Sequence, residues 1–113
     1  MKTSFKYILA FAMFASLTFL MGACGGNEDA ARGLSLIEAS GCQTCHKMEG
    51  ALIGPSYADV AKRYADGGEE LVKNLTRSII NGGSGNWGEV PMTPHPQISE
   101  ADAETMVRYI LSL

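Results

Sequence analysis

The sequence predicts an all-α domain of about four short helices joined by long loops. Apolar residues recur at the spacing of one helix face in the stretches 30–40, 56–65, 69–81 and 99–112. The stretch 81–96 instead carries four glycines and three prolines in 16 residues. The pentapeptide Cys42-Gln43-Thr44-Cys45-His46 has the form of a covalent attachment site. We therefore expect the helices and loops to enclose a covalently bound group.

The pentapeptide is a c-type haem signature. Each thiol adds across one haem vinyl group to form a thioether, and the tether leaves His46 under the iron as an axial ligand. A bare C-x-x-C also occurs in redox dithiols, disulfides and zinc sites. However, no β-branched strands flank Cys42, and only Cys24 and His95 remain as further zinc ligands. The pattern favours one haem c, bound through Cys42 and Cys45.

Residues 1–23 are predicted to be a signal peptide of the lipoprotein type. Lys2 and Lys6 precede the apolar stretch Tyr7 to Met21, which as a helix would span about 22 Å against about 30 Å for a bilayer core. Small residues before Cys24 resemble a bacterial lipobox, which implies cleavage and lipidation at Cys24. A chance cysteine near an ordinary cleavage site, or an uncleaved anchor, is the alternative. We expect an exported protein on the periplasmic side, anchored to the membrane.

Residues 24–113 suffice for one domain. They hold all 12 acidic residues and seven of the nine basic ones, a net charge of −5, so nucleic acid is not expected as a partner. A chain this small buries a modest apolar core. The cofactor should therefore supply much of the folding free energy, and the apo form should be unstable.

The first elements of this domain are a tether and a helix. Residues 24–31 are small, polar and glycine-bearing, which indicates a flexible tether before the haem-binding domain at 32–113. A short helix is expected from about Ala30 to Ser40, ending at Gly41. After His46, Gly54-Pro55 marks a stiff turn. The loop before this turn can place a carbonyl beside the histidine, whose second ring nitrogen needs an acceptor.

Three further helices follow. Ser56 to Ala65 has an apolar face, with Lys62 and Arg63 on the opposite, polar face. Glu69 to Asn81 begins with acidic residues, which favour a helix N-terminus. The last helix should start after Ser99 as its N-cap, with Tyr109 placed to meet the first helix.

The stretch 81–96 is predicted to be a functional loop without regular structure. Trp87 and the prolines argue against a disordered segment, and a stiff segment could hold a sixth iron ligand. Met92 is the favoured thioether, because Met48 lies too close to His46 and Met106 falls on a helix core face. His95 in the same loop is the competing ligand.

These motifs together resemble a class I c-type cytochrome of the short bacterial electron-carrier type. The resemblance covers about residues 30–113, through CQTCH, GPSYADVAKRYA, INGGSGNWGEVPMTPHP and SEADAETMVRYILSL. It implies the class I cytochrome c fold, with the first and last helices crossing. It also implies a role for each of six residues: Cys42 and Cys45 as thioether sites, His46 and Met92 as axial ligands, the Pro55 carbonyl as acceptor from His46, and Trp87 as donor to a haem propionate. The lipobox, His95 and Pro96 depart from the family pattern.

The implied function is one-electron transfer in a respiratory chain, without catalysis. The expected partners are redox proteins: a quinol-oxidising complex or other donor, and a terminal oxidase or reductase as acceptor. The alternatives are a haem sensor or peroxidase-like protein with a displaceable Met92, and a zinc or dithiol module.

Overall fold

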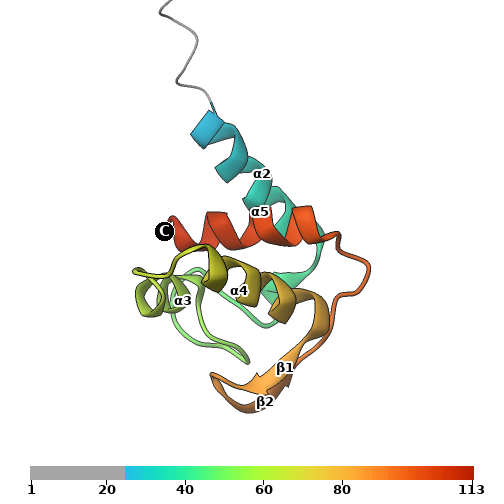
Figure 1. Ribbon diagram of the computed structural model, residues 1–113. Coiled ribbons are helices and arrows are strands. Elements are labelled where there is room, and N and C mark those ends of the chain that lie inside the picture. The colour runs from blue at the N-terminus through green and yellow to red at the C-terminus, as the bar shows by residue number, and fades with distance from the viewer. Residues whose placement is uncertain (1–24) are drawn as a thin grey trace, which may run out of the picture.

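The computed structural model describes residues 25–113; the expected signal peptide at 1–23 and Cys24 lie outside this range. The elements in chain order are helix α2 (Gly25–Ala39), the 3-10 helix η1 (Cys42–Thr44), helices α3 (Tyr57–Arg63) and α4 (Glu69–Asn81), strands β1 (Gly83–Gly85) and β2 (Gly88–Met92), and helix α5 (Glu100–Leu111) (Figure 1). The prediction of a mostly helical domain with four helices is confirmed. None of the helices within 25–113 is long and apolar enough to cross a membrane.

Helices α2 and α5 cross each other (Figure 1), and Gly33 of α2 lies where α5 comes close. A Cβ atom at Gly33 would lie 2.5 Å from Tyr109 Cβ and 2.9 Å from the Thr105 carbonyl oxygen, so the missing side chain permits the close crossing. An ion pair of 2.8 Å between Arg32 and Asp102 joins the same two helices. The predicted meeting of Tyr109 with the first helix is confirmed.

The core lies beneath this crossing. Ile37 of α2, Tyr57 of α3 and Met106 of α5 form one buried cluster, and each is at most 3% exposed. Met106 is thus a core residue, as its place on the helix face predicted. The cluster lies directly against the haem motif, because the partly buried Cys42 packs on it.

The expected flexible tether is corrected by the structure. Residues 25–31 form the first two turns of α2, and nearly all are exposed. Figure 1 shows this end of the helix projecting from the body. Two physical reasons account for the longer helix: Glu28 lies in the first turn, where a negative charge is favourable, and Ala30 and Ala31 are strong helix formers next to the packed Gly33.

Side-chain caps set where α3 and α5 begin. The Ser56 hydroxyl accepts a hydrogen bond from Asp59 N at 3.1 Å, and Ser99 accepts from Asp102 N at the same distance. Both serines have extended backbones that end the preceding loop. The predicted N-cap at Ser99 is therefore confirmed.

Helix α4 spans the residues that the sequence predicted. Val72 and Thr76 on its inner face are buried, and α4 packs along α5. Arg108 of α5 forms an ion pair of 2.7 Å with Glu69, in the first turn of α4. This hydrogen bond and the charge of Arg108 hold the pKa of Glu69 below its usual range.

The stretch predicted to lack regular structure contains a short hairpin instead. Strands β1 and β2 pair antiparallel, with Gly83 opposite Met92 and Gly85 opposite Gly88. Gly85 and Gly88 have φ values of 105° and 112°, which other residues rarely adopt, so the glycines make the tight turn possible. Since nearly every residue of the hairpin is exposed, the sequence carries no alternating apolar pattern to predict it.

Candidate haem site

The two thiols of the pentapeptide lie at either end of η1. Gly41, with a φ of 72°, turns the chain out of α2, and Cys45 N donates to the Cys42 carbonyl at 3.2 Å. Both thiols are free and half-buried. Burial raises the pKa of Cys42, and the neighbouring Cys45 raises it further. A single tight turn thus joins the two half-buried cysteines, and Cys42 packs on the core cluster.

The imidazole of His46 is oriented by a carbonyl. Nδ1 of His46 lies 2.7 Å from the Pro55 carbonyl oxygen. A carbonyl can only accept, so Nδ1 carries the proton and donates it. The Nε2 lone pair is therefore left for a metal ion, which is the arrangement that a ligating histidine needs.

Gly54 lets the backbone approach the imidazole. A Cβ atom at Gly54 would lie 2.5 Å from Cε1 and 2.9 Å from Nδ1 of His46, closer than such atoms ever come. Gly54 N also donates to the Cys45 carbonyl at 2.8 Å. The sequence predicted Gly54 only as part of a turn and did not predict its contact with the imidazole. The position of this glycine directly before Pro55, whose carbonyl was expected beside the histidine, could have indicated the contact.

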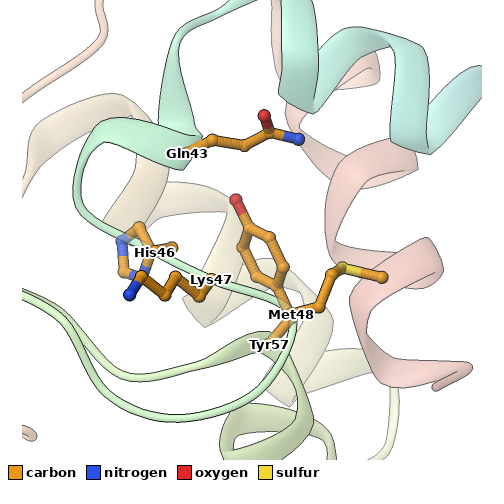
Figure 2. Close-up of a pocket in the computed structure, with 5 residues that line it drawn as sticks. All are labelled: Gln43, His46, Lys47, Met48 and Tyr57. Carbon is orange, nitrogen blue, oxygen red and sulfur yellow. The ribbon is translucent and has the colours of Figure 1, made fainter.

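The ring of Tyr57 packs beside His46. The two ring centroids are 5.8 Å apart and the planes differ by 24°. Figure 2 shows the tyrosine in the middle of a pocket beside His46, with its hydroxyl pointing toward Gln43 and with Met48 also on the pocket wall. The Tyr57 hydroxyl is buried and has no hydrogen-bond partner among the described residues. Burial raises its pKa, so the phenol stays neutral.

Met92 is the last residue of β2. It is half-buried, and its backbone pairs with Gly83 across the hairpin. Gly82, which ends α4 with a φ of 66°, leaves room for the Met92 backbone: a Cβ atom there would lie 2.3 Å from the Met92 carbonyl oxygen. Glycine at 82 thus allows the end of α4 to pack directly on the residue predicted as the sixth ligand.

His95, the competing ligand, is tied to the end of α4. Its backbone N–H donates to the Ile80 carbonyl at 3.0 Å. The Nδ1 atom of its half-buried ring has no hydrogen-bond partner within residues 25–113. In the same range, no three His, Cys, Asp or Glu side chains gather as a metal cluster.

Trp87 lies at the turn of the hairpin and is 41% exposed. The Tyr64 ring meets it edge-on, with centroids 6.1 Å apart. The guanidinium carbon of Arg63 lies 4.4 Å from the Trp87 centroid. The sequence placed Arg63 on the polar face of the helix, and its contact with an aromatic ring was not predicted.

The surface around the site suits a large apolar cofactor. Within residues 25–113, six large apolar side chains are exposed, and five of them belong to the loop 47–55 or the hairpin region. These five are Met48, Leu52, Ile53, Trp87 and Val90, between 41% and 66% exposed. Both segments lie at the lower end of the molecule in Figure 1. Two free thiols, an oriented imidazole and these apolar side chains together fit a haem.

Known proteins resemble this chain in sequence. The family model for cytochrome c matches residues 30–113. Cytochrome c-551 of Allochromatium vinosum is 42% identical over 80 residues, which cover 71% of this chain and 84% of that protein. Cytochrome c-552 of Hydrogenobacter thermophilus is 44% identical over 78 residues, covering 69% of this chain and 78% of that protein.

Solved structures resemble the fold as well. The crystal structure of Nitrosomonas europaea cytochrome c552 matches with a TM-score of 0.65 and 35% identity, over 70% of this chain and 96% of the other. A class 1 cytochrome from Sideroxydans lithotrophicus matches with a TM-score of 0.62 and 25% identity, over 74% of this chain and 95% of the other.

Proposed function

The chain belongs to the cytochrome c family, and from this we propose that it is a one-electron carrier with His46 and Met92 as axial ligands of its haem. Its fold is the class I cytochrome c fold, and its cofactor is a single covalently bound haem c.

The orientation of His46 carries this proposal. The imidazole lies one residue after the second of two free thiols, and the Pro55 carbonyl holds its Nδ1 at 2.7 Å. Both the rotation of the ring and its tautomer are thereby fixed before any metal binds. A redox dithiol has no use for such an oriented imidazole, so the arrangement favours haem ligation by Nε2.

Met92 is proposed as the sixth ligand for two reasons. Its backbone is fixed by pairing with Gly83 and by the close contact with Gly82, so its side chain starts from a defined position. A thioether has no competing hydrogen bonds to break before it binds iron. His95 is the second candidate, because its buried Nδ1 lacks a partner.

The bound haem supplies a one-electron iron couple. The protein contributes the ligands and the surroundings that tune it: methionine ligation and an apolar environment favour the ferrous state, and we propose a positive midpoint potential. With both axial positions taken by side chains, no iron position remains for substrate, so the protein is proposed to have no enzymatic activity. A sensor or peroxidase-like protein would need Met92 to leave the iron.

We further propose that the protein acts in a respiratory chain at the periplasmic side of a membrane, held there by a lipid on Cys24. Its partners would be a quinol-oxidising complex or other donor, and a terminal oxidase or reductase. A labelled fatty acid supplied to the cells should then be incorporated into the wild-type protein and not into a Cys24→Ala variant. A wild-type protein that incorporates no fatty acid would contradict the lipid anchor.

A redox titration of the exported, matured protein tests the carrier function. The proposal expects a one-electron Nernst curve with a positive midpoint and no binding of carbon monoxide to the ferrous protein at neutral pH. Ready carbon monoxide binding would instead support the sensor or peroxidase alternative, because it requires an open axial position.

A further inference from the structure

Helix α3 contacts the turn of the β1–β2 hairpin through Arg63. The guanidinium carbon lies 4.4 Å from the Trp87 ring centroid, and Nη1 donates to the Asn86 carbonyl at 2.8 Å. The Tyr64 ring meets Trp87 edge-on. We call these four residues, Arg63, Tyr64, Asn86 and Trp87, the hairpin clamp.

Within residues 25–113, the other contact of the guanidinium is with the Tyr64 ring, whose centroid lies 5.5 Å from its carbon. None of the four ion pairs found within residues 25–113 involves Arg63, although its side chain is exposed. Arginine suits this position better than lysine, because its planar group can lie on an indole and still donate sideways to a carbonyl. The interactions of Arg63 are thus directed at the hairpin turn.

The hairpin has two points of attachment, and Met92 lies near the other one. At its base, Gly83 pairs with Met92, and Gly82 packs on the Met92 carbonyl. At its turn, the clamp joins it to α3. A lone hairpin of two short strands is marginally stable in water. Attachment at the turn should therefore decide how firmly the strand that ends at Met92 is held.

We propose that Arg63 is a positioning residue for the sixth ligand: it fixes the hairpin turn against α3 and so keeps the Met92 sulfur on the iron. This rests on the proposed function, in which Met92 ligates the haem. Among the described residues, the side chain of Arg63 forms a hydrogen bond with Asn86 and none with Met92. It acts through Asn86, Trp87 and strand β2.

The test is competition between Met92 and added imidazole in the ferric holoprotein. Imidazole displaces a bound methionine, and the loss of the deep-red absorption band of the sulfur–iron bond gives an apparent Kd. Losing the contact between guanidinium and indole should make Met92 detach more easily and lower this Kd about fivefold in Arg63→Met. Arg63→Lys keeps the cation without the fork and should fall between this variant and the wild type.

Lys62→Met is the matched control, because it removes the same charge from the neighbouring exposed position. It should leave the imidazole Kd unchanged. An unchanged Kd in Arg63→Met, or an equal change in Lys62→Met, would overturn the positioning role. The positioning role would also be overturned if Arg63→Met changed the free energy of global unfolding but left the imidazole Kd under native conditions unchanged.

A failure of Met92 ligation would look different. The wild-type protein would then lack the deep-red band altogether, and the proposed function would fall first. Hydrogen exchange would still test the hairpin clamp. The hairpin amides and the Trp87 indole N–H should exchange faster in Arg63→Met than in Lys62→Met. Equal exchange in these two variants would overturn the clamp as well.

Discussion

Replacing Gly54 by alanine tests the packing of the backbone against the imidazole. The new Cβ would lie 2.5 Å from Cε1 of His46, so the ring or the loop has to move. Gly54 does not have a left-handed backbone, and the cost is therefore steric. Any shift that relieves the contact also lengthens the 2.7 Å hydrogen bond between His46 Nδ1 and the Pro55 carbonyl.

The expected loss is large for a domain of this size. Overpacking by one methyl group costs about 1–3 kcal/mol. A lost hydrogen bond costs about 1 kcal/mol more. Together the free energy of unfolding should fall by about 2–4 kcal/mol, against a total of about 5–15 kcal/mol for a typical domain.

Denaturant titration of the holoprotein measures this loss. Gly26→Ala is the control, because it adds the same methyl group in an exposed helix where nothing lies within 4 Å, and it should be neutral or slightly stabilising. If Gly54→Ala unfolded within about 0.5 kcal/mol of the wild type, the loop would not hold the imidazole as described.

The remaining predictions concern three other parts of the chain. Arg108→Met should destabilise the protein at neutral pH. Because the folded protein lowers the pKa of Glu69, the ion pair with Arg108 adds to the free energy of unfolding at pH values above the usual pKa of a glutamate. The difference in unfolding free energy between Arg108→Met and the wild type should therefore vanish as the pH falls through the lowered pKa. A difference that stays constant with pH would refute this. Thr76→Val should stabilise the protein by about 1 kcal/mol, because the buried Thr76 hydroxyl has no hydrogen-bond partner within residues 25–113. A lower midpoint temperature of thermal unfolding in this variant would contradict the prediction. Replacing both Cys42 and Cys45 by alanine should abolish haem staining on a denaturing gel; persistent stain would refute thioether attachment.

Local sequence signals predicted the helices that have clear ends. Ser99 provides a cap, and the amphipathic stretch 69–81 forms α4 with the expected bounds. Residues 25–31 were mistaken for a tether because their glycines and polar residues hide a helix that propagates from the packed Gly33. The local sequence does not indicate where packing against a neighbouring helix stabilises additional turns.

Close approaches between distant residues were the part that the sequence could not predict. The spacing of Cys42, Cys45 and His46 defines the attachment chemistry, because the backbone N–H groups of Cys45 and His46 both donate to the Cys42 carbonyl and so keep the three residues together. The contact of Gly54 with the imidazole ring and of Arg63 with Trp87 depends on how loops return to helices. Arg63 and Trp87 are far apart in the sequence, and Gly54 reaches His46 only because the loop between them folds back; neither contact changes the local pattern of residue types.

The identity of the sixth ligand is tested most directly by the proton spectrum of the ferrous protein. A methionine methyl bound to haem iron lies over the ring current and is shifted far upfield. The account predicts one such resonance, lost in Met92→Leu and retained in His95→Gln. A spectrum without this resonance, or one in which it survives Met92→Leu, would contradict ligation by Met92.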